Sequence, residues 1–477
     1  MRRLQLFILL FAASSLLFQL PPEAFASTPS DITAKGSMTD DENTVLDGAH
    51  GVDTFTIGSS TYAIVLGEQE NGVQIIDISD VDNIVAKGSM TDNDSRNLAS
   101  PRNVSTFTIG SSTYAIVASL TDNGVQIIDI SDVDKIMAKG TATDGEGLFD
   151  ELEGVHAVET FVIGSSTYAI VGSLTDDGVQ IIDISDVDNI VAKGSMTDNG
   201  SRELDGVRDI STFVIGSSTY AIVTASSESG VQIIDISDVD NIVAKGNASS
   251  SDSGFDELQG AYGVDTFTIG SSTFAIVASG GLNGGVQMID ISDVDNIVAK
   301  DKKADEENSF TVLDGGSDVA TFVIGSSTYA IFAANEGITS SDGVQMIDIS
   351  DPANIVAKGS MTDNGSRELD GANRVDIFTI DSITYAIVTA GTDDGVQIIE
   401  LNTDITSPTV TITSSSGDSG DSTSSTTLSY TATFSESVSN FVVGDITVTG
   451  TANSNSPEAS NFAGSGTTYT FDVVQGS

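Results

Sequence analysis

The chain has 477 residues, 39% of them hydrophobic, so it can form more than one domain and a sizeable core. Its formal net charge of −51 at pH 7 excludes nucleic acid as a partner and disfavours anionic membranes, because phosphate would be repelled. With no Cys and only two His, disulfides, thiolate chemistry and zinc sites are not expected.

Residues 1–26 predict an export signal. Arg2 and Arg3 precede an apolar run from Leu4 to Leu20, and cleavage after the small-residue pattern at 24–26 would leave Ser27 as the first residue. A retained membrane anchor is the alternative, although the run is marginally short for a bilayer span. We therefore expect a secreted or cell-surface protein with no direct bilayer insertion after cleavage.

A repeated unit organises most of the chain. Each copy carries a segment close to FTIGSSTYAIV, followed by one close to GVQIIDISDVDNIVAKG, and seven copies recur every 52 to 56 residues. Such a long period predicts a repeat architecture. One aromatic residue marks each copy: Tyr62, Tyr114, Tyr168, Tyr220, Phe274, Tyr329 and Tyr385.

Each unit predicts four short antiparallel strands. In the first unit, segments rich in Val, Ile, Thr, Phe and Tyr lie at 51–57, 61–66, 72–78 and 84–89, and the hairpin signal Gly-Ser-Ser fills 58–60. Four antiparallel strands make one blade of a β-propeller. The sequence therefore predicts an all-β protein with a seven-bladed β-propeller.

The two ends of the repeat array are offset by one strand. Residues 30–38, SDITAKGSM, match a fourth-strand segment, whereas the seventh unit stops at Glu400-Leu401-Asn402 without one. We expect this N-terminal strand to pair with residues 396–400 and close the ring, which removes free sheet edges. A solenoid with open ends is the alternative.

The segments GVQIIDISDVDNI and, in the sixth unit, GVQMIDISDPANI resemble LVIVD repeats, a propeller-forming repeat of secreted and surface proteins. The resemblance covers roughly residues 30–402. It implies a propeller in an extracellular setting, and it implies no defined enzymatic activity and no catalytic residue.

From Ser407 the composition shifts to Ser, Thr and Gly. The segments TVTIT, FSESVSNFVVGDITVTG and FAGSGTTYTF resemble bacterial Ig-like domains of large adhesins, and alternating strands between Ser/Gly turns independently predict a β-sandwich. The expected organisation is a signal peptide at 1–26, a propeller at 27–404 and an Ig-like domain at 405–477. That last domain is either truncated or completed by a partner's strand.

Both histidines fall at one position of the repeat, eight residues before the first turn glycine or its equivalent. We expect this position to ring the channel mouth, on the face whose loops vary, and to offer donors to a carboxylate, a sulfate or an acidic sugar. The aligned residues are His50, Arg102, His156, Arg208, Tyr262, Ser317 and Asn373, with Arg374 next to the last.

Every arginine after residue 26 lies at this position or in the preceding loop, which adds Arg96, Arg202 and Arg367. The alternative interpretation is that each arginine neutralises a neighbouring carboxylate at a crowded acidic surface. The candidates are Asp94, Glu203, Asp209 and Glu368.

No cofactor is expected. A metal site would require His50 and His156 to converge with Asp53 and Glu159. The repeated DISDVD segment offers carboxylates to Ca2+, the one cofactor candidate, but lacks the spacing of a 12-residue calcium loop, so turn formation explains it better.

The predicted function is a secreted or cell-surface binding or adhesion scaffold for a glycan or another extracellular macromolecule, and not an enzyme. One alternative is an extracellular polysaccharide lyase or glycosidase, which His, Tyr and Arg at one mouth would suit. The other is a purely structural envelope protein. The sequence contains no nucleophile elbow or cofactor fingerprint.

Overall fold

A computed structural model describes residues 6–10, 32–93, 95–281, 284–307, 309–335, 342–401, 410–414, 427–438, 441–443, 446–450 and 459–474. The chain divides into two compact units: Ile32–Asn402, and a second unit that combines Met1–Asp31 with Thr403–Ser477. Among the described residues, no helix is long and apolar enough to cross a membrane.

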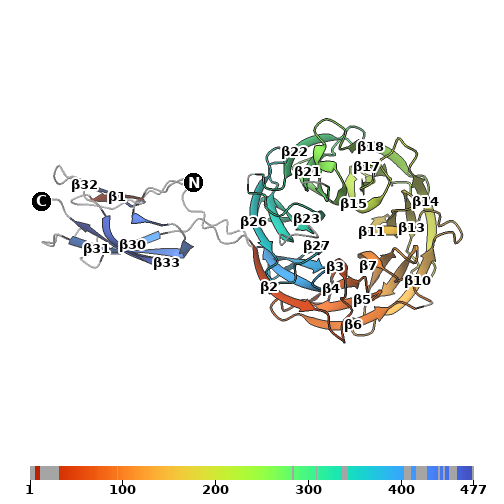
Figure 1. Ribbon diagram of the computed structural model, residues 1–477, viewed down its shortest axis with the longest axis horizontal. Coiled ribbons are helices and arrows are strands. Elements are labelled where there is room, and N and C mark those ends of the chain that lie inside the picture. The colour runs from red at the N-terminus through yellow and green to blue at the C-terminus, as the bar shows by residue number, and fades with distance from the viewer. Residues whose placement is uncertain are drawn as a thin grey trace. The chain divides into compact units, whose positions relative to one another are not determined.

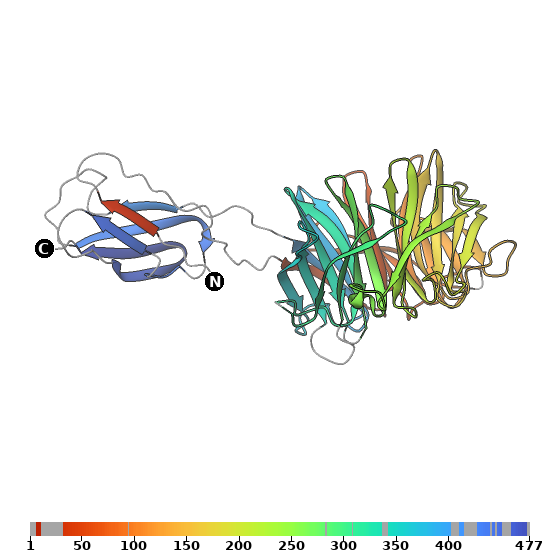
Figure 2. The same ribbon diagram turned by 90° about the horizontal axis from the view of Figure 1, so that it is seen from above.

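The larger unit is a ring of four-stranded antiparallel sheets, the arrangement of a β-propeller (Figure 1). Seen from the side, the strands run across the thickness of the ring (Figure 2). The described strands form seven such sheets, numbered 1 to 7 here by the chain order of their innermost strands.

From the innermost to the outermost strand, the first three sheets contain β3 (Ala49–Ile57), β4 (Ser60–Gly67), β5 (Gly72–Asp77) and β6 (Val85–Thr91); β7 (Pro101–Ile109), β8 (Ser112–Ser119), β9 (Gly124–Asp129) and β10 (Met137–Thr143); and β11 (Val155–Ile163), β12 (Ser166–Ser173), β13 (Gly178–Asp183) and β14 (Val191–Thr197). Sheets 4 and 5 contain β15 (Val207–Ile215), β16 (Ser218–Ala225), β17 (Gly230–Asp235) and β18 (Val243–Ser249); and β19 (Ala261–Ile269), β20 (Ser272–Ser279), β21 (Gly285–Asp290) and β22 (Val298–Ala304), preceded by the 3-10 helix η1 (Asp256–Leu258). Sheets 6 and 7 contain β23 (Gly316–Ile324), β24 (Ser327–Ala334), β25 (Gly343–Asp348) and β26 (Val356–Thr362); and β27 (Ala372–Ile380), β28 (Ile383–Ala390), β29 (Gly395–Leu401) and β2 (Ile32–Thr39).

The core lies between neighbouring sheets. The second and third strands of each sheet are covered on both faces, which is why their sequences are mostly apolar, such as YAIVL in β4 and VQII, with one buried glutamine, in β5. One cluster joins Ile64 and Leu66 of sheet 1 to Val104 and Val117 of sheet 2. The fourth strands form the rim and are mostly exposed or half-buried.

A buried glutamine sits in each apolar third strand. The Gln74 side-chain amide donates to the carbonyl of Lys87 at 3.1 Å, where the register between β5 and β6 shifts, and its oxygen accepts from the backbone N–H of Val45 at 3.2 Å. Gln126, Gln180 and Gln232 make corresponding bonds. The amide therefore satisfies backbone groups that the bulge leaves unpaired.

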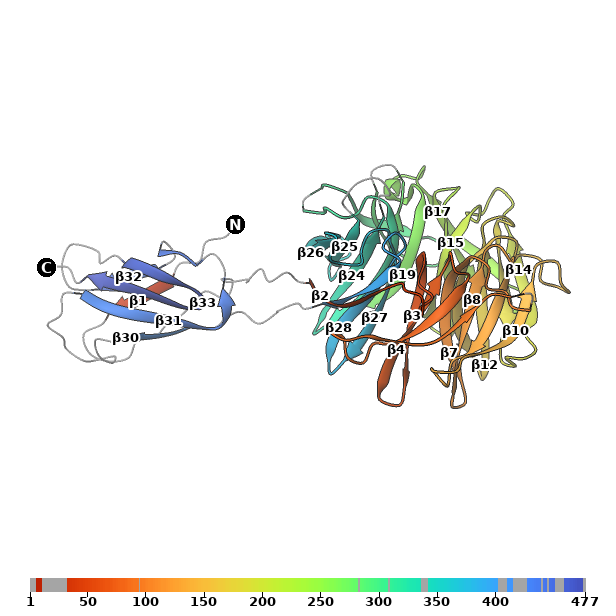
Figure 3. The same ribbon diagram turned by 60° about the horizontal axis from the view of Figure 1, so that its bottom comes forward.

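The strand β2 closes the ring as expected from the repeat. It pairs antiparallel with β29, with Ile32 opposite Leu401 and Met38 opposite Val396. Figure 3 shows β2 beside strands from the far end of the repeat array. Residues of sheets 7 and 1 also share one hydrophobic cluster, so no gap separates the last sheet from the first.

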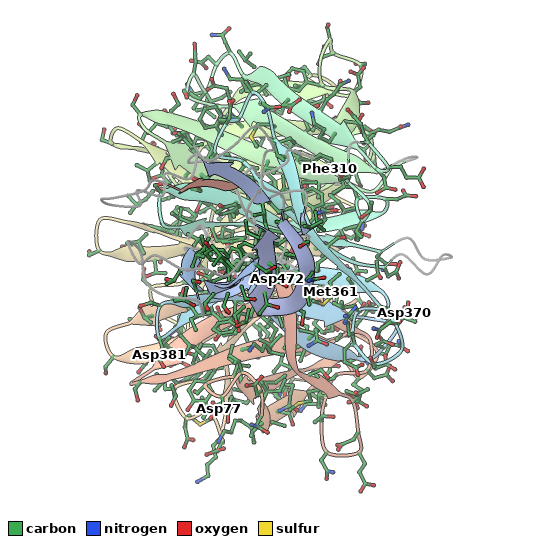
Figure 4. All side chains as sticks on the ribbon, turned by 90° about the vertical axis from the view of Figure 1, so that its left-hand side faces the viewer. Asp77, Phe310, Met361, Asp370, Asp381 and Asp472 are labelled. Carbon is green, nitrogen blue, oxygen red and sulfur yellow. The ribbon has the colours of Figure 1, made fainter. Side chains whose placement is uncertain are left out.

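The turns divide between two faces of the ring. In sheet 7, Asp381 in the turn after β27 and Asp370 in the loop before β27 lie at opposite faces (Figure 4). Because the strands of each sheet are antiparallel, the loops between sheets share a face with the turns between second and third strands. We call this the variable face.

The described strands of the smaller unit form two sheets. The strands β30 (Val410–Ser414), β31 (Thr427–Val438) and β33 (Ala459–Val474) form an antiparallel sheet around Phe434, Tyr469 and Phe471. The strand β1 (Leu6–Leu10), the described part of the predicted export signal, pairs in parallel with β32 (Ile446–Gly450). The predicted cleavage site lies outside the described residues.

Candidate functional site

Five of the predicted mouth residues come together at the centre of the ring. The His50 and His156 rings meet edge to face with centroids 6.0 Å apart, and His156 meets Tyr262 in the same way at 6.2 Å. The Arg208 side chain donates to the Tyr262 hydroxyl at 3.1 Å. We call His50, His156, Arg208, Tyr262 and Arg374 the mouth cluster.

Both imidazoles of the mouth cluster are neutral. Nδ1 of His50 donates to the Arg102 carbonyl at 2.8 Å, and Nδ1 of His156 donates to the Arg208 carbonyl at 2.9 Å. Burial, and then the neighbouring guanidinium groups, lower the pKa of His50 to about 3 and that of His156 well below its ordinary value. Neither ring changes charge near neutral pH.

Arg374 crosses the ring. It extends from β27 in sheet 7, is only 5% exposed, and lies 3.2 Å from a carboxylate oxygen of Asp209 in sheet 4 and 3.2 Å from one of Asp318 in sheet 6. It also donates to the Arg208 carbonyl at 3.3 Å. Burial opposes the charge on Arg374, but the two aspartates outweigh it and raise its pKa.

The remaining aligned residues also bond within the protein. Arg102 donates to a Glu68 carboxylate oxygen at 2.8 Å. Asn373 donates to the carbonyl of Ala49 at 3.3 Å, and Ser317 donates to the carbonyl of Ala372 at 2.8 Å.

Protein carboxylates therefore neutralise two of the arginines predicted at the mouth, Arg102 and Arg374. Of the three proposed carboxylate partners that the structure describes, only Asp209 forms an ion pair with an arginine, Arg374. Arg102 pairs with Glu68 instead. Asp94 lies outside the described residues.

A cavity of about 370 Å³ runs along the axis of the ring. All seven innermost strands line it, and its charged side chains are six carboxyl groups and one guanidinium. We call it the acidic channel, lined by Asp53, Glu159, Asp209, Asp265, Asp318, Asp376 and Arg374.

The channel carboxyls hold protons more tightly than ordinary acids. Burial raises the pKa of Asp265 to about 6 and that of Asp318 to about 7, because desolvation of Asp318 exceeds the attraction of Arg374. Burial, followed by the charge of Asp53 and other channel acids, raises the pKa of Glu159 well above its ordinary value. At neutral pH the channel therefore carries less negative charge than its composition implies.

Most channel residues also form hydrogen bonds between one sheet and the next. Asp376 accepts from the N–H and hydroxyl of Thr54 at 2.8 and 2.6 Å, and Asp265 accepts from the N–H and hydroxyl of Thr321 at 2.7 Å each. Ser105 bonds to the Thr160 hydroxyl in the same way at 3.0 Å. Polar residues that face the channel thus replace the apolar packing found farther out.

The predicted site residues do not include this channel, although the sequence contains a signal for it. Five residues before the turn glycine or its equivalent, the seven units carry Asp53, Ser105, Glu159, Ser211, Asp265, Ala320 and Asp376. This position lies three residues after the mouth position in the same alignment. Because a bulge separates the two positions, both side chains can lie on the same face of the strand.

Replacing Glu159 with glutamine is expected to stabilise the protein at pH 8 by at least about 1 kcal/mol and to have little effect at pH 5. The stabilising contribution of a carboxyl with a raised folded pKa is complete below its unfolded pKa and is lost as the pH rises through the folded pKa. Calorimetric unfolding temperatures at both pH values measure the difference. Glu153→Gln, at an exposed carboxyl, is the control, and an equal gain at both pH values would contradict the prediction.

In the part of the chain that the structure describes, the two mouth histidines are not joined by carboxyl groups in a metal-binding arrangement. Within the described ranges, no group of three or more His, Asp or Glu side chains is arranged to hold a metal ion. In the repeated DISDVD loop, Asp80 accepts from the N–H of Asp82 at 3.2 Å and from the Asn83 side chain at 3.1 Å. These carboxylates therefore serve the turn itself.

Comparisons with known proteins yield a structural similarity alone. No family model and no curated protein matches the sequence. Among solved structures, the dihydro-heme d1 dehydrogenase NirN in complex with DHE is similar over 74% of this chain and 67% of that chain, with 13% sequence identity and a TM-score of 0.45.

Proposed function

We propose that the protein is a secreted or cell-surface binding scaffold. In this proposal the larger unit is a seven-bladed propeller of the LVIVD type, and the smaller unit is an Ig-like module that serves as spacer or attachment. The alternating strands and the Ser/Thr-rich composition after residue 407 support the second assignment.

The observation that carries the proposal is that three loops of the variable face each contain one arginine, held in the same way. Arg96, Arg202 and Arg367 each donate one guanidinium N–H to the carbonyl of the threonine five residues earlier, at 2.7, 2.5 and 2.9 Å. Within the described part of the chain, none of the three forms an ion pair, so their remaining N–H groups can bind a ligand. Displaying binding groups on loops of a rigid scaffold is a common arrangement.

The ligand proposed is a glycan with carboxylate or sulfate groups. Guanidinium groups bind such anions through paired hydrogen bonds, which act at short range. At physiological salt, repulsion from the rest of the acidic surface extends only about 8 Å. An extracellular protein is the other candidate partner.

Binding of the intact protein to a glycan array tests the proposal. The combined Arg96→Ala, Arg202→Ala and Arg367→Ala variant is expected to lose at least about tenfold in affinity for a glycan that the native protein binds, since each charge-assisted bond contributes about 1.5 kcal/mol or more. A variant with Lys139, Lys193 and Lys245 changed to alanine removes the same charge from the rim and should bind normally. Equal losses in the two variants would contradict the proposal.

A polysaccharide-acting enzyme is the second candidate, because Arg208 contacts the Tyr262 hydroxyl and lies 3.4 Å from Nε2 of His156. A lyase could use a tyrosine or histidine as base beside an arginine. Against it, His156 is 1% exposed, so a polymer cannot reach its imidazole in this conformation. Release of unsaturated or reducing sugar ends that disappears in His156→Ala would favour this candidate instead.

A further inference from the structure

The junctions between neighbouring sheets share one side-chain bond near the variable face. The residue just before the third strand of one sheet accepts a hydrogen bond from the backbone N–H just before the innermost strand of the next sheet. We call each such junction a seam and number it by its two sheets. At seam 4/5 the acceptor is the Ser229 hydroxyl, at 3.1 Å. At five other seams it is an asparagine or an aspartate: Asn71 at seam 1/2, Asn123 at seam 2/3, Asp177 at seam 3/4, Asp342 at seam 6/7 and Asp394 at seam 7/1, with distances of 2.8, 2.9, 3.1, 2.8 and 2.8 Å.

The backbone explains why asparagine and aspartate recur at this position. Asn71, Asn123, Asp177 and Asp394 all have φ between 53° and 57°, in the left-handed region that these two residue types tolerate. Both residue types also present an oxygen to the N–H. The fold therefore accepts either an amide or a carboxyl at this position.

At the three aspartate seams the donor side also carries an aspartate. Asp47, Asp205 and Asp370 directly precede the donating glycines Gly48, Gly206 and Gly371. The carboxyl of Asp394 lies within hydrogen-bonding reach of that of Asp47. The same holds for Asp177 with Asp205 and for Asp342 with Asp370. At the asparagine seams the corresponding residues are Ala99 and Glu153, opposite a neutral amide.

Further carboxylates face each aspartate pair. Asp40 and Glu70 adjoin seam 7/1, Asp198 and Glu228 adjoin seam 3/4, and Asp363 and Asp393 adjoin seam 6/7. In the described ranges, no lysine or arginine forms an ion pair with the carboxyls at seams 7/1 and 3/4. One oxygen of Asp198 is buried and accepts no hydrogen bond.

We propose that seams 3/4, 6/7 and 7/1 are proton-dependent latches, in which two aspartates of adjacent sheets share one proton and repel each other once that proton is lost. Burial first, and the partner aspartate in addition, raise the pKa of Asp47, Asp177 and Asp370. A raised folded pKa means that the latch is closed at low pH and loosens as the pH rises through that value. The device does not depend on what the propeller binds.

Amide hydrogen exchange of the whole protein tests the latches. Between pH 5 and pH 8, after correction for the intrinsic exchange rate, protection at Gly48, Gly206 and Gly371 is expected to fall at least about threefold, because the seam weakens once the shared proton is lost. Protection at Ser100 and Gly154, the donors of the asparagine seams, should stay constant. Because the carboxyls of the aspartate seams are partly exposed, apart from that of Asp342, 1 M salt at pH 8 should restore much of the lost protection at seams 3/4 and 7/1.

The matched variants are Asp177→Asn, Asp342→Asn and Asp394→Asn, alone and combined. Each keeps the accepting oxygen and copies the residue already present at seams 1/2 and 2/3, so the ring should fold. Protection at the altered seam should no longer depend on pH. The proposal is wrong if all five asparagine and aspartate seams respond alike to pH, or if the asparagine variants keep the native pH dependence.

Discussion

Replacing Arg374 with methionine is expected to lower the free energy of unfolding by about 3–5 kcal/mol, the usual result of removing one partner from a buried ionic group. Methionine fills much of the same volume, but Asp209 and Asp318 then remain buried without a counter-charge. Both carboxyls have raised pKa values even beside Arg374, so the deficit should be smaller at pH 5, where they bind protons, than at pH 8. Differential scanning calorimetry at both pH values measures the loss.

Two further variants separate the charge effect from lost packing. Adding Asp209→Asn and Asp318→Asn to Arg374→Met should recover most of the stability, because each asparagine still accepts the backbone bond made to Val264 or Val375. Arg102→Met removes a guanidinium from a more exposed pair with Glu68 and should cost about 1 kcal/mol or less. Equal losses in Arg374→Met and Arg102→Met would contradict the interpretation.

Deleting Ile32–Thr39 is expected to abolish the folded ring. The deletion removes every backbone bond that β29 makes on its outer side, and it removes the ion pair of Lys35 with Glu400 at 2.7 Å. The Gln397 amide also loses the carbonyls of Lys35 and Gly36. We expect aggregated protein with an unpaired strand edge, detected by size-exclusion chromatography and far-UV circular dichroism.

A transplanted strand supplies the matched control. Appending a copy of residues 79–91 after Leu401 provides the loop and fourth strand that sheet 1 uses, and it should restore a monomeric folded ring. Removing residues 403–477 from the native chain should leave the ring folded, since they belong to the other unit. A deletion variant that remains folded without the appended strand would show that β2 is dispensable.

The strands could be predicted because their signals are local and repeated seven times. The first innermost strand begins at Ala49, two residues before the predicted start, and the pairing of β2 with β29 followed from comparing one end of the repeat array with the other. Strand order within each sheet needed no information beyond the short turns.

The chemistry of the mouth could not be predicted in the same way. The structure brings His50, His156 and Tyr262, which share one position of the alignment, into one region. One of the two carboxylate partners of Arg374 is Asp209, which lies across the ring and 165 positions away in sequence. Such a contact depends on the diameter of the ring, which no local pattern contains. The role of the buried glutamines could not be predicted either, because it depends on a bulge in the neighbouring strand.

The pairing of β2 with β29 also determines when the ring can close during synthesis of the chain. Ile32 is among the first residues of the ring to be synthesised and Leu401 is the last of its sheet, so at about 5–20 residues per second the ribosome needs roughly 20–70 s to produce both. During that interval the N-terminal segment has no permanent partner, and late assembly of distant segments slows folding. Biogenesis of this protein should therefore depend on whatever keeps its first strand unoccupied until the last one arrives.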